Sequence, residues 1–195
     1  MQPSRYIAMR FVSLSLAGAA LALTGCATGS QGPEGPHKMA TPFDARAAAN
    51  QNKDGKGVVN GSAYVVREGG LVTNCVGGPV VMLPATAYAT ERIQFIYGRA
   101  PEVGEVLSRD GAAAAQQQIS FDPEPVEYRQ HQRSATCDEK GLFQFKRVKD
   151  GDYYVFGLIS WQSQPFEGRL LITRIAVRNE RTPAVMLTPP TKFGP

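Results

Sequence analysis

The feature that most constrains the fold is a run of alternating residues and tight turns over residues 142–161. In "LFQFKRV" (142–148) the two phenylalanines fall on one face and polar residues on the other, which is the pattern of a strand with one buried side. Asp150-Gly151 then provides a turn signal. The next stretch, "DYYVFGLISW" (152–161), is apolar on both faces, as in a central strand. The run at 128–137 precedes this segment across the turn "DEKG". Together they predict two hairpins in series, which form an antiparallel meander.

Similar short runs, bounded by turn residues, occur before and after this segment. They span residues 58–67, 79–86, 128–137, 169–179 and 184–188. Since no long helical pattern separates them, the sequence predicts an all-β chain folded as an antiparallel β-sandwich. A short helix is expected before the first strand, because "TPFDARAAAN" begins with capping residues and continues with alanines. Some residues of the segment 88–118 fall at helical spacing, so a second helix there is an open alternative.

The run "TCDEKGLFQFKRVKDGDYYVF" (136–156) resembles the carboxypeptidase regulatory-like domain, a β-sandwich of the transthyretin (prealbumin) type. The matching positions are Thr136, Asp138, Gly141, Phe143, Phe145, Val148, Gly151 and Tyr153. The sequence departs from the family at Lys149, where proline is common, and in the long segment 88–127. The resemblance implies a transthyretin-like sandwich, and it implies no catalytic residue because the shared positions are structural.

The N-terminus has the features of an export signal. Two arginines precede an uncharged apolar run, which at residues 11–24 is too short to span a bilayer. Leu23-Thr24-Gly25-Cys26 resembles the lipobox of bacterial lipoproteins, in which the cysteine is acylated and becomes the new N-terminus. The alternative is an ordinary secreted protein with Cys26 as a free thiol. By the resemblance we expect an envelope protein held in the membrane by lipid on Cys26, with Ala27 favouring the outer membrane, facing the periplasm.

These features predict three parts of the chain: a signal peptide (1–25), a lipidated tether with a short helix (26–57) and a β-sandwich domain (58–195). Removal of the signal, which holds two arginines and no acidic residue, lowers the formal charge from +4 to +2. No basic stripe is present, so we expect no nucleic-acid partner.

The two remaining cysteines are Cys75 and Cys137. In an oxidising compartment such a pair is expected to form a disulfide. Closing a loop of about 62 residues would contribute about 4 kcal/mol in the chain-entropy model. The alternative is a metal-binding or catalytic thiol, although neither cysteine has a CxxC partner or a nearby histidine.

Polar residues after the second predicted strand form a candidate binding surface, consisting of Thr86, Tyr88, Glu91 and Arg92 together with Thr90. Loops at the ends of sandwiches often bind ligands. The alternative is an internal ion pair beside a packed tyrosine. Trp161 with Tyr153 and Tyr154 could form an aromatic platform for a sugar, but core packing is the simpler interpretation.

Recognisable catalytic patterns are absent from the sequence. His37 and His131 are the only histidines, too few and too separate for a zinc site, and no nucleophile-elbow or phosphate-loop motif occurs. We therefore expect no cofactor, no metal and no enzyme, but a module that binds an envelope protein or the cell wall. The alternative is an envelope hydrolase or carbohydrate-binding protein with its site in segment 88–127, where the candidate carboxylates are Glu91, Asp122, Glu124 and Glu127.

Overall fold

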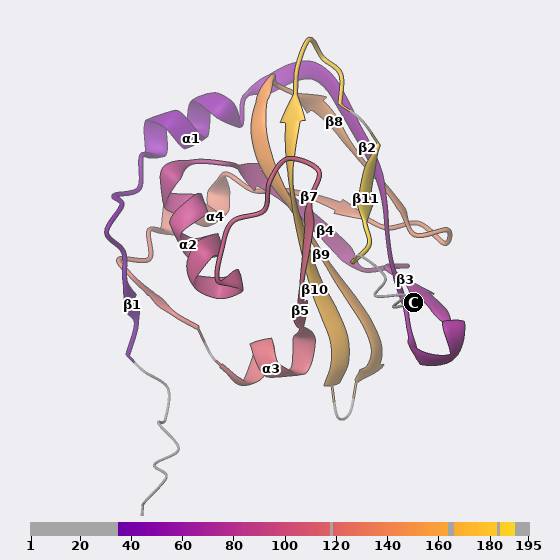
Figure 1. Cartoon of the computed structure of the whole chain (residues 1–195). Coiled ribbons are helices and arrows are strands. Elements are labelled where there is room, and N and C mark those ends of the chain that lie inside the picture. Colours follow the sequence, from indigo (N-terminus) through magenta and orange to yellow (C-terminus); the bar gives the residue numbers. More distant parts are fainter. Residues whose placement is uncertain (1–34, 118, 164–165, 183, 190–195) are drawn as a thin grey trace, which may run out of the picture. The chain divides into compact units, whose positions relative to one another are not determined.

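The computed structural model describes residues 35–117, 119–163, 166–182 and 184–189 (Figure 1). The expected signal peptide and Cys26 lie outside the described residues. Everything below belongs to the unit formed by residues 33–195.

The described residues form eleven strands, four α-helices and one 3₁₀ turn. The strands are β1 (His37–Lys38), β2 (Asp54–Val66), β3 (Val72–Asn74), β4 (Pro79–Pro84), β5 (Val106–Asp110), β6 (Phe121–Asp122), β7 (Arg133–Thr136), β8 (Leu142–Val148), β9 (Gly151–Ser163), β10 (Phe166–Val177) and β11 (Val185–Leu187). The helices are α1 (Ala45–Gln51), α2 (Ala87–Tyr97), α3 (Gly111–Gln116) and α4 (Val126–Gln130), and the 3₁₀ turn is η1 (Glu68–Gly70).

Nine strands build the two sheets of the sandwich, and β1 and β6 form a separate parallel pair. The first has five strands in the order β5-β10-β9-β4-β7, and all its pairs are antiparallel. In the second sheet, β2 pairs with β3 and β8 antiparallel and with β11 parallel. The predicted all-β sandwich is therefore confirmed, with one parallel pair in it. The central position of β9 is confirmed as well. The predicted hairpin pairing is wrong, because β8 pairs with β2 in the second sheet, whereas β7 and β9 pair with β4 in the first.

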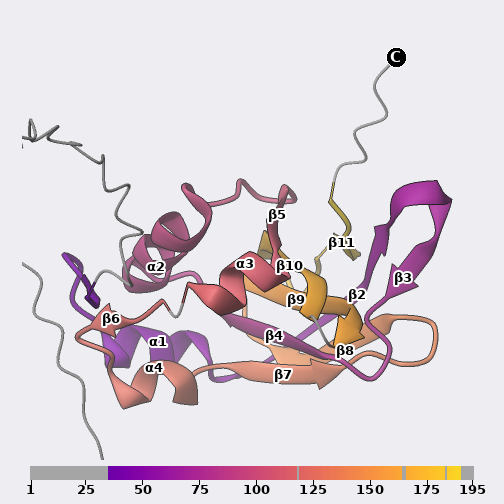
Figure 2. The ribbon, with the colours of Figure 1, turned by 90° about the horizontal axis from the view of Figure 1, so that it is seen from below.

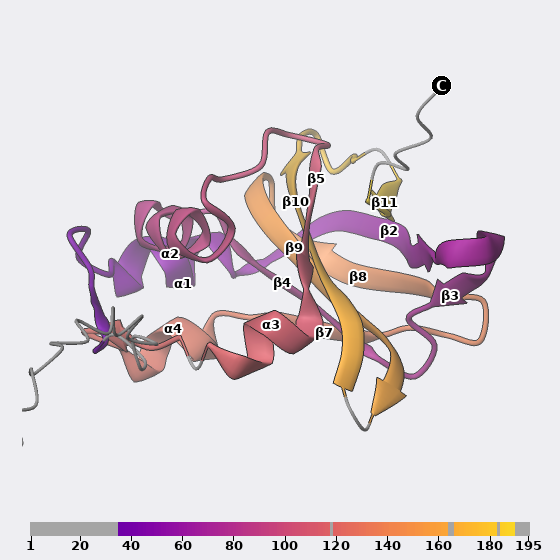
Figure 3. The same ribbon diagram turned by 60° about the horizontal axis from the view of Figure 1, so that its bottom comes forward.

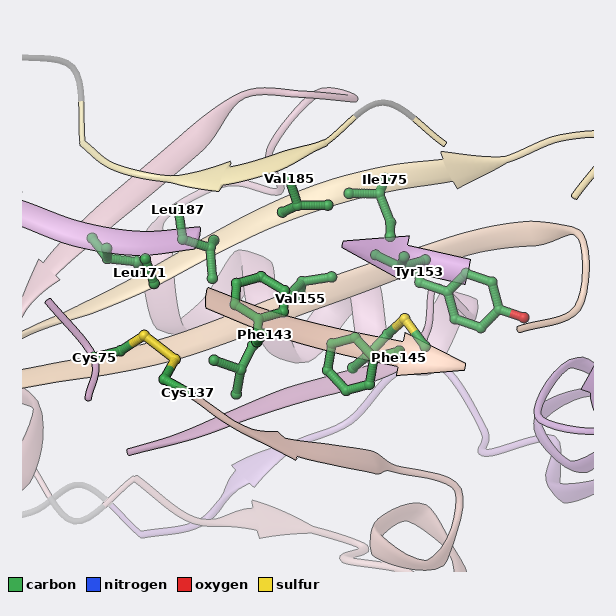
Figure 4. Packing of buried hydrophobic residues seen from close by; sticks show 14 of the residues in the cluster. Cys75, Cys137, Phe143, Phe145, Tyr153, Val155, Leu171, Ile175, Val185 and Leu187 are labelled. Atoms are coloured by element: carbon green, nitrogen blue, oxygen red, sulfur yellow. A yellow bond between two sulfur atoms is a disulfide. The ribbon is translucent and has the colours of Figure 1, made fainter. Parts of the chain in front are cut away.

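The main core lies between the two sheets (Figure 4). Phe143 and Phe145 point into it and are 4% and 3% exposed, whereas Leu142 and Gln144 beside them are exposed. Gly61 of β2 allows this close packing, because an added Cβ would lie 2.3 Å from the Phe143 ring. The prediction that Phe143 and Phe145 lie on the buried face of this strand is therefore confirmed.

A second apolar cluster lies on the opposite face of the five-stranded sheet. It is formed by Leu83, Tyr88, Ala89, Ile93, Tyr128, Tyr154 and Ile172. Successive residues of β9 point to opposite faces of the sheet, so that Tyr153 lies in the main core and Tyr154 in the second cluster. Helices α1, α2 and α4 gather at one end of the molecule, and the β2–β3 hairpin projects at the other (Figures 2 and 3). The five-stranded sheet is therefore covered on both faces.

The predicted disulfide between Cys75 and Cys137 is confirmed. Cys75 follows β3 in the second sheet, and Cys137 follows β7 in the first. Both residues are 3% exposed. The bond therefore links the two sheets across the edge of the core, and both cysteines serve structure rather than metal binding.

The expectation that residues 26–57 form a tether is wrong from His37 onward. Strand β1 pairs with β6, and Ala48 of the predicted helix is 2% exposed. The side chains of Met39 and Phe43 pack against the second cluster, and this burial offsets the entropy lost on ordering the segment. The helix begins after Asp44, whose side chain accepts a hydrogen bond from the Ala47 N–H group at 2.9 Å.

The predicted strand over 128–137 is also wrong in its first half. Helix α4 occupies Val126–Gln130, His131 ends it, and only Arg133–Thr136 are extended. A helical turn brings Tyr128 into the second cluster, where it is 8% exposed. The open expectation of a helix in the 88–118 segment is confirmed by α2, and α3 adds another.

Candidate functional site

The polar cluster singled out in the sequence lies on α2 and at its N-terminus. Thr86 caps the helix, since its hydroxyl accepts a hydrogen bond from a backbone N–H group of the first turn at 3.2 Å. Tyr88 is 1% exposed, and its hydroxyl donates to the carbonyl oxygen of Pro123 at 2.8 Å. Tyr88 is therefore not a surface residue, and the Thr86 side chain caps the N-terminus of α2.

Glu91 connects α2 to the chain before α1. Its two carboxylate oxygens accept hydrogen bonds from the backbone N–H groups of Ala40 and Thr41, each at 2.7 Å. His37 Nε2 lies 3.8 Å from the same carboxylate. Hydrogen bonds from the Thr41 side chain and from the Ala40 backbone lower the pKa of Glu91, and the second backbone bond and His37 add to this effect. Glu91 thus holds the N-terminal segment in place.

Arg92 is enclosed by aromatic rings. The centre of its guanidinium lies 3.8 Å from the Phe121 ring centroid and 4.6 Å from that of Tyr128. It pairs with Glu124 at 3.1 Å, and its side chain is 12% exposed. Burial raises the pKa of Tyr128 to about 12, which keeps this phenol neutral beside the cation. The alternative of an internal ion pair beside a packed tyrosine is confirmed for this cluster.

The four candidate carboxylates of segment 88–127 are not brought to one site. Glu91 and Glu124 are engaged in the internal contacts above, whereas Asp122 and Glu127 are exposed. None of the four lines either of the two hollows described next.

A different surface, which the sequence analysis missed, lies on the second sheet. We call it the outer face. It consists of Val58, Asn60, Ser62, Tyr64, Val66, Val72, Asn74, Leu142, Gln144 and Met186. Strand register places them together, for example Asn60 opposite Gln144 and Ser62 opposite both Leu142 and Met186. The alternation of polar and buried residues in β2 is the signal that could have found it.

Among the described residues nothing covers the outer face, and its ten residues are uncharged. Half of the ten exposed large apolar side chains in the described chain lie on it, among them Met186 (57% exposed) and Leu142 (47%). Charged residues begin only beyond its end, at Lys56 and Lys146. Apolar side chains grouped on an exposed surface indicate an interaction site.

A hollow of about 720 Å³ opens on this face. Its lining includes Asn60, Ser62, Gln144 and Met186. Gln144 Nε2 donates to Asn60 Oδ1 at 2.7 Å, which orients both amides. Its charged lining residue, Asp138, is engaged in its own turn, where one carboxylate oxygen accepts from two backbone N–H groups at 2.8 and 2.9 Å.

The hollow offers neutral donors and acceptors. An amide pair joined by one hydrogen bond retains further N–H donors and a carbonyl oxygen. Within the described residues, the hydroxyls of Ser62 and Thr136 make no hydrogen bond to another protein group. Polar positions between aliphatic side chains suit a ligand that is uncharged, rich in hydroxyls and apolar on its C–H faces.

The aromatic residues considered as a sugar platform are divided by the fold. Tyr153 and Tyr154 are 1% and 0% exposed, so the core interpretation is confirmed for both. Trp161 is half-buried and lies at the rim of a smaller hollow.

Among the described residues, no group of three or more metal-ligating side chains converges. Within the same residues, no helix has the length and apolar character needed to cross a membrane.

Comparison with known proteins finds a likeness to a solved structure. No family model and no curated protein matches the chain. A solved structure from Pseudomonas aeruginosa, described as a proposed carbohydrate-binding protein, superposes with a TM-score of 0.59 at 24% identity. The match covers 76% of this chain and 98% of that one. At this identity the likeness shows a shared fold.

Proposed function

We propose that this protein is a non-catalytic, lipid-anchored binding module of the bacterial envelope and that its outer face binds an uncharged glycan. The observation that carries the proposal is the outer face itself. It is an uncovered sheet surface with an oriented amide pair, free hydroxyls and aliphatic side chains, and its central part is uncharged. Neutral sugar rings present hydroxyls around their edges and C–H groups on their faces, which matches this arrangement.

Two further observations support the proposal. The structural neighbour from Pseudomonas aeruginosa carries a carbohydrate-binding description. The sequence before Cys26 resembles a lipobox, which would hold the module at the membrane. Mass spectrometry of the mature N-terminus tests this anchor, and an unmodified Cys26 would remove it from the proposal.

The internal use of Glu91 and Glu124 favours binding over hydrolysis. Glycoside hydrolases depend on two carboxyl groups facing each other across a cleft. In segment 88–127, Glu91 and Glu124 hold neighbouring structure, and none of the segment's carboxylates lines either hollow.

Calorimetric titration with uncharged hexasaccharides, such as cellohexaose and maltohexaose, tests the binding. The chain should carry Cys26→Ser so that no lipid is attached. Two lost hydrogen bonds at about 1 kcal/mol each should raise Kd roughly 30-fold in the double variant Asn60→Ala and Gln144→Ala. A matched control changes the exposed amides Gln94 and Gln130 to alanine and should leave Kd unchanged.

Equal affinity of the two double variants would contradict the outer-face site. Absence of glycan binding, together with capture of an envelope protein that is lost in the Asn60 and Gln144 variant, would replace the glycan with a protein partner on the same face.

A further inference from the structure

A second hollow, of about 320 Å³, lies where the end of β2 meets the β9–β10 hairpin. It is separate from the hollow on the outer face and shares none of its lining residues. Its lining includes Arg67, Glu68, Trp161, Glu167, Arg169 and Pro189. Unlike the outer face, this groove is strongly charged, so it should select a different ligand.

Trp161 is fixed at the rim of the groove. Its ring packs against the main core while remaining half-exposed. The indole Nε1–H donates to Glu167 Oε2 at 2.6 Å. This bond orients the ring and occupies one oxygen of the carboxylate, so the second oxygen can still accept a hydrogen bond.

Arg67 supplies a positive charge that the described residues do not neutralise. Its guanidinium lies 4.9 Å from the centroid of the Trp161 ring. Arg169, in contrast, pairs with Asp110 at 3.0 Å. In the described part of the chain Arg67 forms no ion pair or side-chain hydrogen bond. A guanidinium presents several N–H donors in a planar fork, the geometry that binds carboxylates in a bidentate manner.

We infer that this groove binds an acidic sugar, a ring that carries both a carboxylate and hydroxyl groups. The carboxylate would pair with Arg67, and the hydroxyls would donate to Glu68 and to the second oxygen of Glu167. A neutral sugar provides no partner for Arg67. A simple carboxylate provides no hydroxyls for the two glutamates. The inference rests on the proposed glycan-binding function and adds a second site, which selects acidic sugars where the outer face selects uncharged ones.

Trp161 is the only tryptophan of the chain, so its fluorescence reports on this groove. Trigalacturonic acid is the probe, with maltotriose and acetate as comparisons, all titrated into the Cys26→Ser chain. We expect a saturable change in Trp161 emission with trigalacturonic acid alone. A tenfold or greater rise in Kd is expected for Arg67→Gln, whereas Arg46→Gln, an exposed arginine on α1, should leave Kd unchanged.

An equal response to acetate would show a general anion site, and an equal response to maltotriose would show that charge is not selected; either result overturns the inference. A full response in Arg67→Gln also overturns it. If Arg67→Gln does not fold, Arg67→Lys keeps the charge without the planar fork and should weaken binding by a smaller factor. The Asn60 and Gln144 variant should retain the fluorescence response, which separates failure here from failure at the outer face.

Discussion

The far faces of the two sheets offer the most instructive comparison. The five-stranded sheet is covered on its far face by α1, α2 and α4 and the aromatic cluster beneath them. The far face of the second sheet, the outer face, is left open to solvent. The covered side contains Glu91 and Arg92, which looked like binding residues in the sequence. The open side contains uncharged residues that the sequence did not indicate as binding residues.

The difference shows that a cluster of polar residues in the sequence does not by itself indicate where a ligand binds. Glu91 and Arg92 are used inside the domain. Glu91 accepts hydrogen bonds from the N-terminal segment, and Arg92 lies over Phe121 and pairs with Glu124. The outer face needs no such contacts and stays available. Each prediction below compares one feature of the covered or linking structure with a matched exposed position.

The largest expected effect concerns the link between the two sheets. Replacing both Cys75 and Cys137 by alanine should lower the free energy of unfolding by about 4 kcal/mol, because the unfolded chain is no longer constrained. For a domain of this size that corresponds to a fall in Tm of about 8–16 °C. Thermal unfolding followed by circular dichroism, with and without reductant for the parent chain, measures it. An unchanged Tm would contradict the structural role of this disulfide.

The next effect compares one tyrosine from each face. Tyr154 is fully buried under the helices, and its hydroxyl lies 3.0 Å from Thr90 Oγ1. Tyr154→Ala should cost about 3 kcal/mol. Tyr64 lies on the outer face opposite Asn74, and Tyr64→Ala should cost about 1 kcal/mol or less. Urea unfolding measures both, and similar losses would mean that the outer face is covered in solution.

A smaller effect compares two arginines that pair with the same carboxylate. Arg92 contacts Glu124 at 3.1 Å with its side chain 12% exposed, whereas Arg129 contacts it at 3.6 Å and is 76% exposed. Arg92→Gln should cost about 2 kcal/mol, because a desolvated cation over aromatic rings is lost. Arg129→Gln should change stability by less than about 0.5 kcal/mol. Equal effects in urea unfolding would show that the aromatic enclosure of Arg92 adds nothing.

The smallest effect is a pH dependence from Glu91. Its pKa is lowered in the folded state by the bonds to Thr41 and Ala40. The stability from these bonds is therefore fully present above the pKa of the unfolded chain and is lost as the pH falls from about 5 towards 3. Glu91→Gln should flatten the stability profile in that window. Glu127→Gln, at an exposed position on α4, should leave the profile unchanged.

The strands and the core could be predicted because local pattern and tertiary burial agree there. The partner of β8 could not, because it pairs with the distant strand β2 instead of its neighbour β9. Phe143 and Phe145 alternate with polar residues in a strand that has one buried face. Gly141 ends the turn before β8 with a φ of +73°, a conformation that favours glycine. The pairing of Cys75 with Cys137 followed from their number alone once an oxidising compartment was assumed.

The N-terminal part and the sites could not be predicted because their properties depend on distant partners. The composition of residues 26–57 is typical of a linker. Contacts with distant residues, such as the packing of Phe43 against Tyr88 with ring centroids 5.4 Å apart and the pairing of β1 with β6, make its described part belong to the fold. Neither Asn60 nor Gln144 is unusual in its own strand. They are 84 residues apart in the sequence, and the register of β2 and β8 brings Gln144 Nε2 to 2.7 Å from Asn60 Oδ1. This pairing of distant residues forms part of the hollow.

The measurement that tests the central claim most directly is an NMR titration of the ¹⁵N-labelled Cys26→Ser chain with cellohexaose. The account predicts saturable shifts of the side-chain amides of Asn60 and Gln144 and of the backbone amides around Ser62, with the signals of α2 unchanged. Shifts centred on Glu91 and Arg92, or no shift anywhere on the outer face, would contradict it.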